Sequence, residues 1–97
     1  MLDIKLEHIT KSHIPTKKYD AHITVKGRKK VVPFGAKGYP DFTTTGDEKK
    51  KELYLQRHKK RENWSDPRTP GFWSRWLLWN QPTLRDSEKS LRSRFGL

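Results

Sequence analysis

The sequence predicts a small α+β domain with an N-terminal arm or strand, a β-hairpin and then three helices, of which a Trp-rich one is central. Three observations lead to this prediction. Apolar and polar residues alternate up to residue 34, a loop rich in glycine follows, and helix caps with helical spacing begin near residue 45. A chain of 97 residues forms one domain at most. We divide it into an arm, 1–17, and a basic α+β domain, 18–97.

The arm contains a short strand pattern, because Leu2, Ile4 and Leu6 alternate with charged residues. A polar spacer over residues 12–18 separates this pattern from the next strand. The strand can therefore pair within the chain or on a neighbouring subunit. If a neighbouring subunit holds this strand, we expect residues 2–9 to bury their apolar side chains against that other chain.

The segment YDAHITV, residues 19–25, alternates more regularly and predicts the first strand of the hairpin. A two-residue turn at Gly27-Arg28 would place Ile23 opposite Val32 and Ala21 opposite Phe34. Both pairs are apolar and share a face, so the register is self-consistent.

The first helix is predicted from Gly46 to about Arg61, with Thr45 and Glu48 as a capping box. Its apolar stripe is thin and includes Leu53 and Tyr54, which predicts a helix on the surface.

The second helix, PGFWSRWLLWN over residues 70–80, begins with Thr69 as cap and Pro70 at its first position. The third helix begins with Thr83 and Asp86 as caps, has a buried side marked by Leu84, Leu91 and Phe95, and ends at Gly96.

The Trp-rich helix is apolar on most of its circumference, with Trp73, Trp76, Leu77 and Asn80 on one face, and Trp76 is expected at the centre of the core. One interpretation is that the sheet and the other helices cover it. The other is that part of it docks on another protein, because the remaining apolar residues look too few to enclose it. Base stacking by this packed cluster is the least expected use. The candidate partner-binding residues are Leu2, Ile4 and Leu6 of the arm and Phe72, Trp73, Trp76 and Trp79.

The charge is strongly positive, with 22 Lys and Arg against 11 acidic residues, a net charge of +11 and a pI near 10.1. This composition favours nucleic acid, acidic protein or anionic lipid as partners. Each basic cluster taken alone is equally compatible with a solvated helix surface. The candidate polyanion-binding residues are Lys49, Lys50, Arg57, Lys59, Lys60, Arg61, Arg85, Lys89 and Arg92.

We expect neither an enzyme nor a bound cofactor or metal. The chain has no cysteine, GAKG lacks the spacing of a phosphate-binding loop, and the four histidines are scattered. Asp41 is better explained as a turn residue after Pro40. The N-terminus lacks the pattern of a signal peptide, and no apolar stretch is long enough to cross a bilayer.

The segments FGAKGYPDFT and YLQRHKKRENWSDPRTPGFWSRWLLWNQPTL resemble a family of small basic proteins of large nucleocytoplasmic DNA viruses, the giant viruses and their algal-virus relatives. The resemblance covers about residues 18–97 and carries over no catalytic residue.

Two functions are expected. One is a structural component of the virion, a minor capsid or cementing protein that docks on neighbouring capsid subunits and is present inside the host cell during assembly. The alternative is a protein that binds nucleic acid without reading its sequence.

Overall fold

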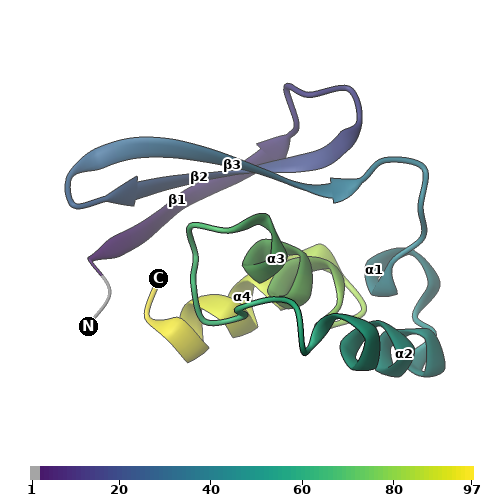
Figure 1. Ribbon diagram of the computed structural model, residues 1–97. Coiled ribbons are helices and arrows are strands. Elements are labelled where there is room, and N and C mark those ends of the chain that lie inside the picture. The colour runs from purple at the N-terminus through teal and green to yellow at the C-terminus, as the bar shows by residue number, and fades with distance from the viewer. Residues whose placement is uncertain (1–2) are drawn as a thin grey trace.

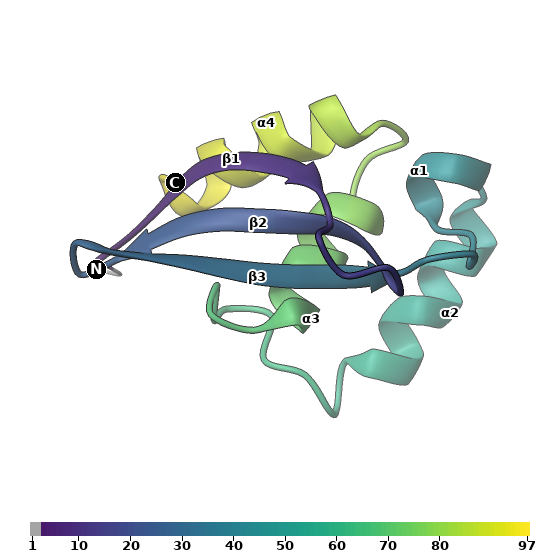
Figure 2. The same cartoon turned by 90° about the horizontal axis from the view of Figure 1, so that it is seen from above.

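The computed structural model describes residues 3–97 and has two layers, a three-stranded antiparallel sheet and a group of helices (Figure 1). The helices α3 and α4 lie against one face of the sheet, and α1 and α2 lie beyond the end of β3 (Figure 2). The predicted α+β class is confirmed. In chain order the elements are β1 Ile4–Lys11, β2 Lys17–Val25, β3 Arg28–Ala36, α1 Phe42–Thr45, α2 Glu48–His58, α3 Pro70–Trp73, the π-helical turn η1 Ser74–Leu78 and α4 Leu84–Phe95.

The sheet has the order β1-β2-β3, so β2 is central and the other two strands are edges. Its inner face carries the alternating apolar side chains that the sequence shows, and each is at most 3% exposed: Leu6, Ala21, Ile23, Val32 and Phe34. This face forms one side of the hydrophobic core.

The β2–β3 hairpin differs from its predicted register by two residues. Ala21 pairs with Val32 and Ile23 with Lys30, so the turn is Lys26-Gly27. Both turn residues have positive φ, 50° and 79°, as a type I′ turn requires, and glycine adopts this conformation without strain. A shift of two residues leaves every side chain on its predicted face, so the core pattern was right although the pairing was wrong.

The N-terminal segment forms β1, which pairs with β2 of the same chain and places Leu6 opposite Ile23. Leu6 is 1% exposed, and Ile4 is half-buried against the same core. The structure therefore assigns both to the core of their own chain instead of to a contact with a neighbour. Leu2 lies outside the described residues.

The polar spacer explains how β1 folds back. Asp20 is buried and accepts hydrogen bonds from the Ser12 hydroxyl, at 2.6 Å, and from the His13 backbone N–H, at 3.0 Å. These bonds fix residues of the connection onto β2, so the spacer acts as an ordered turn.

The first edge of the sheet is covered by Arg92 of α4. Its guanidinium donates to the backbone carbonyls of Leu6 and Glu7 at 3.1 and 3.4 Å, where a bulge interrupts β1. A bulge and a charged side chain both discourage the addition of another strand at an edge.

The helix α2 begins later than predicted, at Glu48, because Asp47 and not Thr45 caps it. The Asp47 carboxylate accepts from the backbone N–H of Lys49 at 3.0 Å. Residues 42–45 form the separate short helix α1, which ends at Gly46 with φ 65°. This left-handed residue separates the two helices.

The predicted cap of the Trp-rich helix is confirmed, since Thr69 accepts from the Phe72 backbone N–H and Pro70 occupies the first turn. The expected single helix over 70–80 instead changes to a π-helical turn after Trp73. Its wider bond runs from the Trp79 N–H to the Ser74 carbonyl at 3.1 Å.

The Trp-rich segment is enclosed by its own chain. Phe72 and Trp73 are 0% exposed and Trp76 is 8% exposed, so Trp73 rather than Trp76 is the most enclosed indole. The structure assigns these three residues to the core instead of to a docking surface.

The enclosure uses more than apolar residues. The guanidinium groups of Arg75 and Arg94 lie over the Trp76 ring at 4.2 and 4.5 Å. Arginine side chains can cover apolar surface while their charge reaches water. Counting apolar residues alone therefore underestimated the available cover.

The last helix, α4, follows the prediction closely. Thr83 accepts from the Asp86 backbone N–H at 3.1 Å, and Gly96 ends the helix with φ 68°. Leu91 is fully buried on the side that faces the core.

Candidate functional site

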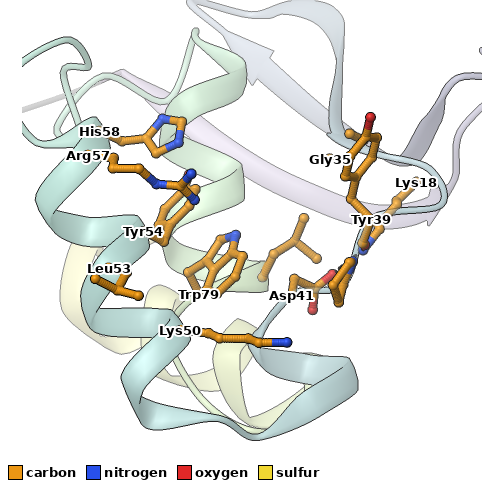
Figure 3. Close-up of a pocket in the computed structure, with 13 residues that line it drawn as sticks. Lys18, Gly35, Tyr39, Asp41, Lys50, Leu53, Tyr54, Arg57, His58 and Trp79 are labelled. Carbon is orange, nitrogen blue, oxygen red and sulfur yellow. Dashed lines mark hydrogen bonds and ion pairs between the residues drawn. The ribbon is translucent and has the colours of Figure 1, made fainter.

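A concave surface lies between α2 and the end of β3, and we call it the α2–β3 groove. It has a volume of about 640 Å³. Figure 3 shows side chains of α2 along one side, Gly35, Tyr39 and Asp41 on the other, and Trp79 between them. The groove is lined by Lys18, Gly35, Ala36, Tyr39, Pro40, Asp41, Lys50, Leu53, Tyr54, Arg57, His58, Leu78 and Trp79.

All the residues that α2 contributes to this groove lie on one face of the helix. Lys50, Leu53, Tyr54, Arg57 and His58 follow one another at helical spacing, which places them in a row along the helix. Tyr54 is buried at the base of this row, whereas Leu53 is 49% exposed. The face therefore combines an apolar surface with two cations.

The aromatic rings of the groove form a column. Tyr54 lies parallel to Trp79, with centroids 4.5 Å apart and an angle of 7° between the planes, and His58 stacks on Tyr54 at 4.3 Å. Burial raises the pKa of Tyr54, and the nearby Glu62 carboxylate adds to this effect. Tyr54 is therefore a neutral phenol at physiological pH.

The opposite side is held by an ion pair between Lys18 and Asp41. The Lys18 ammonium also donates to the Tyr39 backbone carbonyl, and Asp41 caps α1 by accepting from Thr43. These contacts fix the loop before α1. They leave the Tyr39 side chain 71% exposed at the edge of the groove.

The free charge of the groove is positive. Asp41 is the one carboxylate among its lining residues, and Lys18 neutralises it. No ion pair involves Lys50 or Arg57 within residues 3–97. The groove is therefore suited to a ligand that is both flat or apolar and negatively charged.

A second basic surface lies at the tip of the β2–β3 hairpin, which we call the hairpin tip. Lys26, Arg28, Lys29 and Lys30 are all exposed there. From the sequence, only a turn was predicted in this segment, and none of these cations was named as a candidate site residue. Four cations in five residues were the signal that could have identified this surface.

The structure separates the predicted polyanion-binding residues into several groups. Lys50 and Arg57 lie in the groove, whereas Lys49 lines a different side of α2. Lys59, Lys60 and Arg61 are exposed in the turn after α2.

The three predicted cations of α4, Arg85, Lys89 and Arg92, line one shallow surface together, as the helical spacing predicts. Arg92 differs from the other two because it pairs with Glu88 at 3.0 Å and holds β1. The Arg92 guanidinium is therefore already engaged within the fold and is less available to bind a polyanion than Arg85 and Lys89.

Of the predicted partner-binding aromatics, Trp79 alone lines the α2–β3 groove. It is half-buried, because the π-helical turn carries it to the end of the segment and against Tyr54. Tyr39, Tyr54 and Leu53 were not predicted as site residues. The helical row from Lys50 to His58 was the available signal for the α2 side.

Between residues 3 and 97, no group of three or more His, Cys, Asp or Glu side chains is placed to hold a metal ion. No helix in that range is long and apolar enough to span a membrane.

Comparison with known proteins gives one match. Neither the curated proteins nor the solved structures include a match to the chain. The model of a protein family, DUF5754, matches residues 7–58, which run from β1 to the end of α2 and include both sides of the groove apart from Leu78 and Trp79. Since this match covers more than half of the 97 residues, the chain belongs to DUF5754, a family of unknown function.

Proposed function

We propose that this protein is not an enzyme but binds nucleic acid through contacts of Lys and Arg with phosphates, without reading the base sequence. The supporting observation is the number of cations left free of carboxylates. Within residues 3–97, Lys18, Arg68 and Arg92 are the only Lys and Arg side chains in ion pairs, out of 22 in the sequence. Phosphate contacts supply most of non-specific affinity for nucleic acid.

The distribution of the free cations supports contact with an extended polyanion. The hairpin tip and α2 lie at opposite ends of the molecule (Figures 1 and 2). The longest dimension is 39 Å, comparable to one turn of B-DNA, about 34 Å. Cations spread over this length match a repeating row of phosphates better than a single small anion.

The test measures affinity for a labelled DNA duplex by fluorescence anisotropy as salt is raised from about 50 to 200 mM. We expect a steep linear fall of the logarithm of affinity with the logarithm of salt concentration. Neutralising two cations of the hairpin tip, Lys29→Gln with Lys30→Gln, removes up to two phosphate contacts and lowers the slope by up to about 2. Scrambling the duplex sequence leaves the affinity unchanged.

The control for each of these two substitutions is Lys18→Gln, which removes one cation that Asp41 already neutralises, so the slope changes are compared per cation removed. We expect a smaller change in slope for this variant, with its melting temperature measured in parallel. Absence of duplex binding at about 50 mM salt, or an affinity independent of salt, contradicts the proposal.

The alternative proposal is a structural role in a viral particle, as a minor capsid or cementing protein among other capsid proteins. The edge strand β3 favours it, because an edge can accept a strand from a neighbour. It has less support than nucleic-acid binding, because Leu6, Phe72, Trp73 and Trp76 are buried within the chain. Co-purification with capsid proteins from infected cells, lost on charge reversal in β3, tests it.

A further inference from the structure

The α2–β3 groove has the dimensions and the walls of a site for one planar ligand. Its volume of about 640 Å³ is in the range of small-molecule sites, about 300–1,000 Å³. Tyr54 and Trp79 are parallel and packed together, so the orientation of the Trp79 ring is fixed before any ligand binds. Tyr39 stands on the opposite side as an exposed aromatic ring.

The Tyr39 ring is exposed to solvent, whereas the rings of the buried tryptophans Trp73 and Trp76 are not. A stacking surface needs an aromatic ring that solvent can reach. Tyr39 is 71% exposed, and Trp79 is half-buried and lines the same groove from a different element. The groove therefore offers aromatic surface from two elements to a flat ring that enters it.

The charges of the groove select a negative ligand. Lys50 and Arg57 lie seven residues apart on α2, which places them about 10 Å apart along the helix axis, on either side of Leu53. The single carboxylate, Asp41, is neutralised by Lys18. An anionic group attached to a flat ring fits this arrangement.

We propose that the α2–β3 groove holds an unpaired nucleotide of single-stranded nucleic acid, with the base against Tyr39 and Trp79 and the phosphates at Lys50 and Arg57. This inference rests on the proposed function and makes it more specific. A duplex keeps its bases stacked inside, so its phosphates meet the basic surfaces while its bases stay out of the groove. The groove contacts then add to the affinity that the cations outside the groove provide, so the protein binds a single strand more tightly than it would without the groove.

The test compares a labelled single strand of about 16 nucleotides with the duplex of the same sequence, by anisotropy at constant salt. Tyr39→Ala removes an exposed ring and is expected to weaken single-strand binding about fivefold or more, while duplex binding stays within about twofold. The control is Val31→Ala, which also shortens an exposed apolar side chain, 41% exposed, but on the sheet and away from the groove.

A second pair of variants adds one negative charge to α2 inside or outside the groove. Leu53→Glu places a carboxylate between Lys50 and Arg57, and Gln56→Glu adds the same charge at an exposed position that does not line the groove. We expect Leu53→Glu to weaken single-strand binding about tenfold more than Gln56→Glu does. Both variants weaken duplex binding to a similar, smaller extent. Circular dichroism checks that each variant is folded.

The outcomes separate the two proposals. If duplex binding is normal but Tyr39→Ala and Leu53→Glu behave like their controls, the groove does not hold a nucleotide, and the general binding proposal stands. An acidic peptide as the natural occupant gives this same result and overturns the inference. If the unaltered protein binds neither single strand nor duplex at low salt, both proposals fail.

Discussion

The largest fully buried side chain of the core, Trp73, gives the sharpest test of how the domain is held together. It is 0% exposed, packs edge-on against Phe72 at 4.9 Å, and donates from its indole nitrogen to the Pro67 carbonyl at 2.7 Å. Trp73→Ala therefore removes both a large buried surface and a hydrogen bond that anchors the loop before α3.

The magnitude follows from these two losses. Truncation of a buried Trp to Ala costs about 3–5 kcal/mol, and loss of the donor to a buried carbonyl adds about 1 kcal/mol. A domain of this length has a free energy of unfolding of about 5–15 kcal/mol. We therefore expect Trp73→Ala to lose about 4–6 kcal/mol, which leaves the protein partly unfolded if its stability is at the lower end.

Urea denaturation followed by far-UV circular dichroism measures this loss, provided that the slope m is the same for both proteins. Trp73→Phe is the matched variant, because it keeps an aromatic ring but loses the indole donor, and we expect a smaller loss. A loss below about 1.5 kcal/mol for Trp73→Ala would refute the placement of this residue at the centre of the core.

Three further predictions concern single residues. Burial raises the pKa of Asp20, but the hydrogen bonds from His13 and Ser12 together outweigh it and hold this pKa below its usual value. Asp20 therefore stabilises the fold above about pH 4, and this contribution is lost as the pH falls through its folded pKa. Asp20→Asn should lower the melting temperature at pH 7 and flatten its fall between about pH 4 and 2, measured by thermal denaturation at each pH. Arg92→Met keeps the side-chain stem but loses the hydrogen bonds to the Leu6 and Glu7 carbonyls, which costs about 1.5–3 kcal/mol of stability. Hydrogen exchange in β1 should therefore become faster, and unchanged exchange contradicts this role of Arg92. Gly27→Ala should cost about 1 kcal/mol in urea denaturation, because φ is 79° while a Cβ there meets no atom within 4 Å.

The alternation of residues predicted the strands well, because a buried face selects every second side chain whatever the exact pairing. The same property hid the error in the hairpin register. Ala21 and Val32 both face the core with either turn, so the pattern cannot distinguish registers that differ by two residues. The turn residues do not distinguish them either, because Gly27 at the first position suits a type II′ turn, whereas Gly27 at the second position suits the type I′ turn that forms.

The site was harder to predict, because it is assembled from distant segments. Tyr39 follows the sheet, Tyr54 is on α2, and Trp79 ends the π-helical turn. No local pattern joins these residues. The stack of Tyr54 on Trp79 depends on the wider helical turn before Trp79, which the sequence spacing did not reveal.

The covering of β1 by Arg92 also sets the order in which the protein can fold during its synthesis. The bond from Arg92 to the Leu6 carbonyl joins residues 86 positions apart. The strands leave the ribosome first, yet Phe34 and Ile23 have no cover until α3 and α4 follow. Residues 7–58, the part that matches the family model, therefore expose an apolar sheet face while the rest is being translated. A nascent chain stalled before α3 should bind a chaperone that recognises apolar segments, and one extended past α4 should release it.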